Sequence, residues 1–394
     1  MTATTPTTLK SAPGGTGPTD PQRRFRAEDI LPVARAAAAA AGVTRLADVT
    51  GLDRIGMPVW QAVRPLSRAL SVHQGKGARD ADAQVGALLE AVESHWAEEF
   101  DQAGPICRFD DLAPAERAPT LGDFAARGDA PPDNVPYRWA EARDVLTGDR
   151  LYLPFELVSL DFTRLVPSRF DRSSNGVAAG ATVDEALAAA LNELIERDAV
   201  LEWESGGLLH CTASTLRIET VPFDWFHFWR DRLRSLGIAV RISSAHSLTG
   251  TPVFVCELND RSPDVAAYQL ICGYGSHADP EVALFRALSE AIQARATYIA
   301  GAREDLFPYY RPPPADRALA RFGLPLGAGM RGVEWPEILP GPVGSQAIAL
   351  ALAQAGYPTI AALELARPEG LGVVRSFAFG LGSGRRRRRA PQRR

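Results

Sequence analysis

The clearest pattern in the chain is a glycine-punctuated polar segment that leads into apolar residues at helical spacing. It covers residues 174–197. Thr182 and Glu185 stand in the S/T-x-x-E spacing of a capping box, which predicts that a helix begins there. The apolar stripe of this predicted helix consists of Ala186, Leu187, Ala190, Leu191 and Leu194.

The same pattern recurs once upstream and once downstream. Upstream, Gly-Lys-Gly at residues 75–77 precedes a helix predicted over residues 80–100. Downstream, Gly-Tyr-Gly at residues 273–275 precedes Asp279-Pro280, which is typical of a helix N-terminus. That third helix is predicted to continue to about residue 300.

The remaining pattern predicts strands and helices in irregular alternation. Gly42 ends a predicted alanine-rich helix. The order favours an α/β protein with hairpins over a regular βαβ array. Helices are predicted over residues 32–41, 224–236 and 345–355, and strands over residues 59–64, 69–72, 151–158, 238–242, 251–258, 268–272, 359–363 and 373–379.

Each of the three glycine-led helices carries acidic or amide side chains three residues apart, and such side chains share one helix face. An unpaired buried carboxylate is costly, and Mg²⁺ at a nucleotide removes that cost because it binds carboxylates together with phosphate oxygens and water. Glycine-rich segments ahead of helices also offer backbone N–H groups to phosphate. The pattern therefore predicts a magnesium–nucleotide site. Its carboxylates are Glu90, Glu93, Glu193, Glu196 and Glu290, and the cations that offset phosphate charge are Lys76, Arg197, Arg286 and Arg295.

A structural interpretation competes with this one. A carboxylate pair at this spacing usually belongs to a solvated helix face or a surface ion-pair cluster, and short motifs often match by chance. Gly75-Lys76-Gly77 lacks the spacing of a Walker A loop, so taken alone it indicates a tight turn. The threefold recurrence adds weight to the nucleotide site, and both interpretations stay open on these residues.

Composition excludes several classes of protein. Of 394 residues 46% are hydrophobic, and a net charge of −4 argues against broad attraction to nucleic acid or membranes. Four cysteines without a C-x-x-C pair disfavour a zinc site or disulfide framework and suit a reducing cytoplasm. No stretch is apolar for long enough to span a membrane.

Both ends of the chain are predicted to be solvated tails. Residues 1–24 are predicted to be disordered. Residues 385–394 open with five arginines and form a predicted basic tail, with binding to nucleic acid or an acidic partner as the alternative.

Motifs in the same three segments resemble the YcaO-domain family. The resemblance covers about residues 45–383, with the motifs in the family's order. The central match consists of Ser174-Asn175-Gly176, Gly180-x-Thr182-x-x-Glu185-Ala186 and Glu193-Leu194-Ile195-Glu196-Arg197-Asp198. The flanking matches are Gly75-Lys76-Gly77 with Glu90-x-x-Glu93, and Arg286-Ala287-Leu288-x-Glu290-Ala291-x-Gln293-x-Arg295.

The resemblance implies a YcaO-type ATP-binding fold with mixed, mostly antiparallel sheets and alanine-rich helices. The implied cofactors are ATP and Mg²⁺, and the implied reaction is phosphorylation of a peptide backbone amide on its carbonyl oxygen, followed by attack of a nucleophile. An amide oxygen is a poor leaving group and phosphate a good one, so the protein's task is positioning and charge neutralisation. The resemblance assigns no catalytic residue.

Site residues follow from the resemblance position by position. Ala181 stands where the family commonly has Asn beside the nucleotide, so one polar contact is missing. Glu185 acquires two compatible roles, capping-box partner and metal-site carboxylate. The implied metal-site carboxylates are Glu90, Glu93, Glu185, Glu193, Glu196 and Glu290, and the implied nucleotide contacts are Lys76, Ser174, Arg197, Arg286, Gln293 and Arg295.

The subtype rests on three further phrases, at residues 58–65, 298–305 and 373–381, which resemble family members that work with a TfuA-type partner in thioamidation. The expectation is therefore an enzyme that forms a thioamide in a peptide or protein substrate with a separate TfuA-like partner, without membrane or nucleic-acid binding; a homodimer stays open. An azoline-forming cyclodehydratase, a non-catalytic docking scaffold and a regulatory nucleotide-binding protein are the alternatives. The expected organisation is a disordered tail at 1–24, a helical lead-in at 25–57, a YcaO domain at 58–384 and the basic tail at 385–394.

Overall fold

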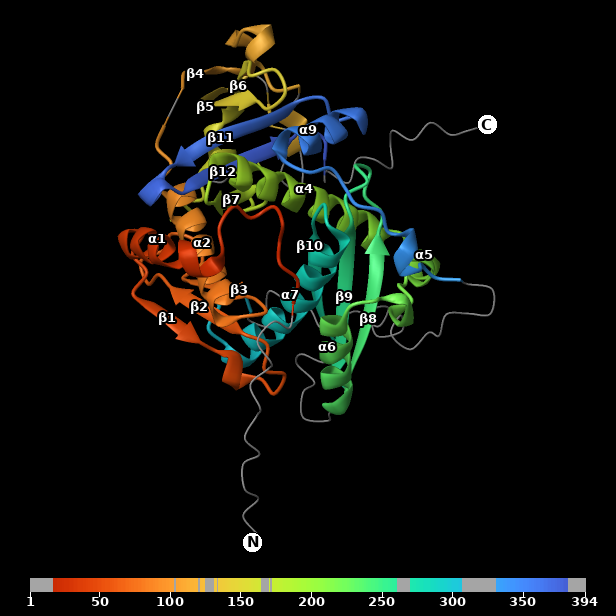
Figure 1. Cartoon of the computed structure of the whole chain (residues 1–394). Helices are drawn as coiled ribbons and strands as arrows, with labels where there is room; N and C mark the ends of the chain where they lie inside the picture. Colours follow the sequence, from red (N-terminus) through yellow and green to blue (C-terminus); the bar gives the residue numbers. More distant parts are fainter. Residues whose placement is uncertain are drawn as a thin grey trace, which may run out of the picture.

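Three strand–helix units form the framework of the part of the chain that the structure describes. In Figure 1 their helices lie toward the middle of the molecule, each packed on its own strand. The helices are α2 (Asp80–Glu98), α4 (Val183–Ser205) and α7 (Pro280–Ala300), and their strands are β3 (Val72–Lys76), β7 (Val177–Gly180) and β10 (Leu270–Ser276). The computed structural model describes residues 17–102, 104–119, 121–124, 131–132, 134–163, 170, 172–260, 270–306 and 331–381.

The three units interlock in a circle. Helix α2 packs on β3 and also contacts β7, the strand of the second unit. Helix α4 in turn contacts β10 of the third unit, and α7 contacts β3 of the first. The circle brings side chains from three distant parts of the chain to a common centre.

Each strand belongs to an antiparallel sheet. Two sheets are three-stranded, in the orders β1-β2-β3 and β10-β9-β8, and the third has the order β4-β5-β11-β12-β7 with β6 paired to β5. The strand pairs of the described residues are antiparallel throughout, so the predicted fold class is confirmed. The other strands are β1 (Arg45–Asp48), β2 (Val59–Val63), β4 (Ile106–Arg108), β5 (Pro136–Asp144), β6 (Arg150–Pro154), β8 (Ile238–Ala245), β9 (Val253–Asp260), β11 (Ile360–Ala366) and β12 (Gly372–Ala378).

Glycine and alanine let the helices approach their strands closely. A Cβ atom at Gly75 in β3 would overlap the backbone of Ala83 and Ala87 in α2. Gly273 in β10 stands in the same relation to Ala287 and Ala291 in α7. Glycine thus removes the side chain that would hold strand and helix apart. Gly75 and Gly273, which the sequence assigned to phosphate-binding segments, therefore lie within strands and serve packing.

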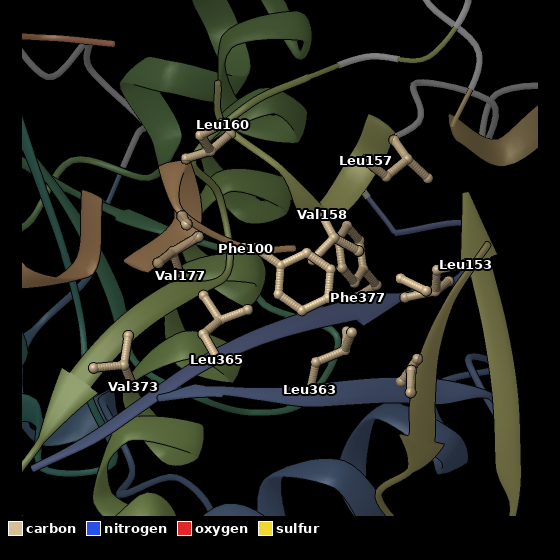
Figure 2. Close-up of a cluster of buried hydrophobic side chains, with 14 of the residues drawn as sticks. Phe100, Leu153, Leu157, Val158, Leu160, Val177, Leu363, Leu365, Val373 and Phe377 are labelled. Carbon is tan, nitrogen blue, oxygen red and sulfur yellow. The ribbon is translucent and has the colours of Figure 1, made fainter. Parts of the chain in front are cut away.

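The largest hydrophobic core lies on one face of the six-stranded sheet. Figure 2 shows side chains from β11 and β12 meeting those of β6, β7 and the segment around α3 (Phe155–Val158). Burial of this apolar surface is the main favourable contribution to folding. The labelled residues are Phe100, Leu153, Leu157, Val158, Leu160, Val177, Leu363, Leu365, Val373 and Phe377.

Shorter helices cover the outside of the units. Helix α1 (Ala27–Ala40) packs on α2, α6 (Asp224–Ser235) on β8, and both α5 (Gly207–Ala213) and α9 (Ser345–Gln354) on α4. Among the described residues, a helix of membrane-spanning length and apolar character is lacking.

Several predictions about single elements were wrong. Residues 151–158 form strand β6 followed by the short helix α3, since Pro154 breaks the expected strand. The strand expected at 69–72 lies at Val72–Lys76 instead. Residues 17–24, expected to be disordered, are placed, with His277 Nε2 lying 3.2 Å from Asp20 Oδ1. Most of the tail at 1–24 and all of that at 385–394 lie outside the described residues, and the domain boundaries stay predictions.

Candidate functional site

The three units hold their carboxylates in the same way. A backbone N–H in or just ahead of each strand donates to a glutamate on the helix that follows. Gln74 N donates to Glu90 Oε2 at 2.6 Å, 16 residues away in sequence, and Tyr274 N donates to Glu290 Oε1 at 3.3 Å with the same separation. In the central unit Gly176 N donates to Glu193 Oε2 at 3.0 Å. The recurrence seen in the sequence therefore corresponds to a repeated structural device.

Contacts between units tie these carboxylates into one cluster. Ala179 N in the second unit donates to Glu93 Oε1 of the first at 2.7 Å. Lys76 Nζ in the first unit donates to Glu290 Oε2 of the third at 2.8 Å. We call Glu90, Glu93, Glu193, Glu196 and Glu290 the carboxylate cluster. Because its members come from all three helices, the circle of units must be closed for it to exist.

Burial and mutual repulsion perturb the pKa values of the cluster. Burial raises the pKa of Glu90, Glu93 and Glu193, and neighbouring cluster carboxylates raise each of them further. Burial and the charge of Glu290 raise the pKa of Glu196 to about 7. Burial also acts to raise the pKa of Glu290, but the ammonium of Lys76 outweighs it and the pKa is lowered. The cluster thus holds more negative charge than its cations offset.

Four cations surround the cluster. Lys76 pairs with Glu290, and Arg197 Nη2 lies 3.6 Å from Glu193 Oε1. The charge of Arg303 acts on Glu90. Arg286 is exposed and acts on Glu93, Glu193 and Glu196 through its charge. In the described part of the chain its guanidinium forms no hydrogen bond or ion pair, while its backbone carbonyl accepts from Ser289 Oγ. A guanidinium without a carboxylate partner beside an acidic cluster is suited to bind phosphate oxygens.

A cavity of about 610 Å³ lies beside the cluster. Arg286, the first turns of α4, the end of β10 and residues 20–25 line it. Asp20 anchors this N-terminal segment: burial acts to raise the pKa of Asp20, but its hydrogen bond to His277 lowers it to about 2. His277 Nδ1 in turn accepts from Asp279 N at 3.0 Å. The cavity is within the size range of small-molecule sites.

Glu185 lies in this cavity, eight positions before Glu193 on α4. Thr182 Oγ1 accepts from Glu185 N at 3.1 Å, so the predicted helix start is confirmed. Burial raises the pKa of Glu185, while the charge of Arg23 and the backbone amides of Arg24 and Ala181 lower it. Its described contacts connect it to the cavity lining and not to the carboxylate cluster.

The other residues implied by the resemblance are scattered around the cluster. Gln293 Nε2 donates to Gln74 Oε1 at 3.1 Å, next to the amide that holds Glu90. Ser174 is exposed in the turn before β7, where its carbonyl accepts from Val177 N. Arg295 is 3% exposed and pairs with Asp53 at 2.9 Å and Asp260 at 2.8 Å. The described ion pairs of Arg295 therefore involve Asp53 and Asp260 and none of the cluster carboxylates.

Sequence reasoning missed several contributors to the site. Arg303 lies in a phrase noted only for its resemblance to one subtype. Arg375 in β12 is 1% exposed, donates to Ser173 O at 2.6 Å, and has its pKa lowered to about 9 by burial, against the charge of Glu193. Residues 20–24 were assigned to a disordered tail, although Asp20 and the arginines at 23 and 24 were a signal of an ordered polar contact.

The residues present fit Mg²⁺ and a nucleotide. Among the described residues no three His, Cys, Asp or Glu side chains converge into a closed metal site. An open set of carboxylates suits Mg²⁺, which uses one or two carboxylates and takes its other ligands from phosphate and water. The orphaned Oε2 of Glu185 and the unpaired Arg286 show that donors and acceptors are left over for a ligand. Glu90, Glu93, Glu193, Glu196 and Glu290 would hold the metal, and Lys76, Arg197 and Arg286 the phosphates.

The fold and this charge arrangement define an α/β protein of the Mg²⁺–nucleotide-binding class. Residues 74–380 match the family described as YcaO cyclodehydratases, ATP- and Mg²⁺-binding. That match spans more than half of the 394 residues, and the chain belongs to the YcaO family. The resemblance found in the sequence is confirmed.

Curated relatives support the family and are themselves uncharacterized. The chain is 35% identical over 284 residues to the uncharacterized protein in the tfuA 3′ region of Rhizobium leguminosarum bv. trifolii, covering 68% of this chain and 65% of that protein. It is 31% identical over 282 residues to an uncharacterized protein of Methanothermobacter thermautotrophicus, covering 67% and 68%. The chain thus spans slightly less than two thirds of the length of the Rhizobium relative.

Solved structures share the fold. The YcaO protein of Methanopyrus kandleri, bound with AMPPCP and Mg²⁺, superposes with a TM-score of 0.70 at 23% identity, covering 91% of this chain and 92% of that one. A heterocyclase in complex with substrate and cofactor gives a TM-score of 0.70 at 20% identity, covering 92% and 53%. The likeness to the Methanopyrus protein extends over a larger share of the chain than the family match does.

Proposed function

We propose that this protein activates a backbone amide of a peptide or protein substrate by ATP-dependent phosphorylation of the carbonyl oxygen, and that a TfuA-type partner takes part in converting this amide to a thioamide. The carboxylate cluster carries the proposal. In the described part of the chain, five buried or half-buried carboxylates from three helices share only two direct ion pairs, which leaves an excess of negative charge. Such an excess is unfavourable unless a cation joins it.

Mg²⁺–ATP, when bound, supplies a phosphoryl group that turns the amide oxygen into a leaving group; the oxygen departs as phosphate and sulfur from a sulfide donor replaces it. The chain's own groups would neutralise the charge of the ligand and hold it in position. Backbone amides of Gln74, Gly176 and Tyr274 fix the carboxylates before any ligand arrives. Lys76 is held by Glu290, so its charge is already in place. Groups fixed in advance cost no reorganisation during the reaction.

Two findings on other proteins support the finer parts of the proposal. The Methanopyrus YcaO protein is bound with AMPPCP and Mg²⁺, which supports a phosphate-bearing nucleotide and the same metal ion at the site proposed here. The Rhizobium relative lies in a tfuA 3′ region, which supports a TfuA-type partner and hence thioamide formation.

Calorimetric titration of the full chain with ATP, with and without Mg²⁺, tests the nucleotide site. The native chain should bind ATP only with Mg²⁺, and Glu196→Gln should weaken binding by about 100-fold because it removes a charged ligand. Glu202→Gln is the matched control, an exposed glutamate on the same helix, and should bind like the native chain. A folded native chain that binds no Mg²⁺–ATP would refute the proposal and leave the scaffold alternative.

Product analysis tests the chemistry. The chain is incubated with candidate peptides, ATP, Mg²⁺, a sulfide source and the TfuA-type protein, with the peptide amide oxygen isotopically labelled. Transfer of the label into phosphate together with exchange of one oxygen for sulfur supports thioamidation. Loss of one water from the peptide would instead establish azoline formation, and ATP hydrolysis without a change in the peptide would point to a regulatory nucleotide-binding protein.

A further inference from the structure

Arg286 connects the cavity to the carboxylate cluster, because it lines the cavity and acts on Glu193 and Glu196 through its charge. With the phosphates at the cluster and Arg286, as proposed above, this cavity is the neighbouring space that could take the nucleoside. The wall formed by α4 carries Ala181 just before the helix, then Ala188 and Ala189, which offer no polar side-chain group.

Most polar side chains in the lining already have partners. Asp20 accepts from His277, and Asp184 accepts from Ser345 Oγ. Ser276 Oγ donates to the backbone carbonyl of Asn192 at 2.8 Å. Pairing of this kind is the rule for buried polar groups.

Two buried acceptors in the lining have no hydrogen-bond partner in the described part of the chain. They are Glu185 Oε2, on a residue that the family resemblance already implicates, and Asn192 Oδ1. Asn192 is 7% exposed, so water reaches it poorly. A buried acceptor without a donor costs about 1–3 kcal/mol, and a ligand that brings a donor removes this cost.

We infer that the side-chain oxygen of Asn192 accepts a hydrogen bond from the nucleoside of the bound nucleotide, which makes Asn192 a specificity-determining residue. The inference rests on the proposed nucleotide binding. The donor is the exocyclic amine of the base or a hydroxyl of the ribose, because both present a hydrogen to an acceptor.

The position of Asn192 suits this role. The backbone carbonyl of Asn192 accepts from Ser276 Oγ of β10, which fixes this turn of α4 before the ligand binds. Seven residues separate it from Glu185, which places the two acceptors on one face of α4, roughly 10 Å apart along the axis. That spacing is of the order of a nucleoside's length, so the two acceptors meet different parts of it. Asn192 also supplies a side-chain amide to the cavity, whereas Ala181, which stands where the family commonly has Asn, supplies none.

The test compares the Mg²⁺ complexes of ATP, purine riboside triphosphate, 2′-deoxy-ATP and 3′-deoxy-ATP. The first analogue lacks the base amine and the other two each lack one ribose hydroxyl. Calorimetry gives the affinity of each for the native full chain, for Asn192→Leu, which has a similar shape without an acceptor, and for Asn192→Asp, which keeps the oxygen. Thermal unfolding of each variant confirms that it is folded.

One analogue should bind the native chain about tenfold more weakly than ATP. Asn192→Leu should bind ATP and that analogue equally, and Asn192→Asp should keep the difference even where its added charge weakens both. The analogue that shows this identifies the donor. Equal ATP-to-analogue ratios in the native chain and Asn192→Leu for all three analogues would overturn the inference while leaving the proposed function intact, and would assign Asn192 Oδ1 to a buried water. If the native chain bound no Mg²⁺–ATP, both proposals would fall.

Discussion

Buried charges occur in two kinds of region in this molecule, and the two regions differ in how those charges are paired. Beside α7, Arg295 pairs with Asp53 and Asp260, and Arg54 adds a second cation to Asp260 at 2.6 Å. Behind α2, Arg64 pairs with Glu98 at 2.9 Å, and Ser67 and Ser94 donate to the same carboxylate. In these networks opposite charges meet directly.

The carboxylate cluster is different, although it is built on the same helices. Glu93 and Glu196 form no ion pair with another residue in the described part of the chain, and both have raised pKa values. Burial acts to raise the pKa of Glu98 as well, but its hydrogen bonds to Arg64 and Ser67 lower it. The two kinds of region therefore differ in ion pairing and not in burial: the paired charges stabilise the fold, and the unpaired carboxylates are available to a ligand.

The largest expected effect concerns Arg295. Arg295→Met leaves Asp53 and Asp260 without the guanidinium, and breaking a buried pair from one side costs about 3–5 kcal/mol. Urea denaturation should show this loss in the free energy of unfolding. Arg367→Met, which breaks an exposed pair with Glu364, should leave the free energy of unfolding nearly unchanged. A stable Arg295→Met variant that fails to bind Mg²⁺–ATP would show instead that Arg295 is a nucleotide contact, as the family resemblance implies.

The second prediction concerns the pH dependence of stability without Mg²⁺. The folded-state pKa of Glu196, about 7, lies above its ordinary value of 4.5, so between these values the folded chain binds more protons than the unfolded chain. The contribution of Glu196 to the free energy of unfolding is then fully present at about pH 4. It is lost as pH rises through 7, a decrease of about 3 kcal/mol from this group. Thermal unfolding in EDTA should show the loss, Glu196→Gln should reduce it, and Mg²⁺–ATP should restore stability at about pH 8.

Glu98→Gln provides the opposite case. In the native chain the pKa of Glu98 is lowered in the folded state. The ion pair with Arg64 therefore contributes stability at pH values above the unfolded-state pKa of Glu98, and that contribution disappears as pH falls through the folded-state pKa. The variant should be less stable than the native chain at neutral pH, and the two curves should converge in acid. If Glu98→Gln and Glu196→Gln changed the pH profile in the same direction, the contrast between the two regions would be wrong.

The helices and the carboxylate pairs could be predicted because their causes are local. Periodicity, a capping threonine and the three-residue spacing of acidic side chains can each be recognised within a short segment of sequence. The glycines at 75 and 273 were recognised as special, but a strand packed against alanines and a phosphate loop require glycine alike. Only the position of the following helix decides between these two explanations.

Closure of the circle could not be predicted, because it depends on contacts between distant parts of the chain. Lys76 and Glu290 meet across 214 residues, and Gln74 and Gln293 across 219. For the same reason the sequence assigned both Arg286 and Arg295, nine residues apart on α7, to the nucleotide site, Arg295 less securely. Their surroundings differ because Asp53 and Asp260 pair with Arg295, and no local pattern in the sequence indicates those contacts.

The smallest expected effect concerns Asp20, which combines features of both regions: it is paired, like the structural networks, yet it lines the cavity. Asp20→Asn removes the charge that meets His277 and should cost about 1 kcal/mol or less of stability. If the pair holds residues 20–25 against a bound nucleotide, the variant should release Mg²⁺–ATP a few-fold faster, since about 0.6 kcal/mol corresponds to a factor near three. Stopped-flow displacement measures this rate, with the exposed Asp29→Asn as control. An unchanged release rate with lowered stability would place the Asp20–His277 pair with the structural networks alone.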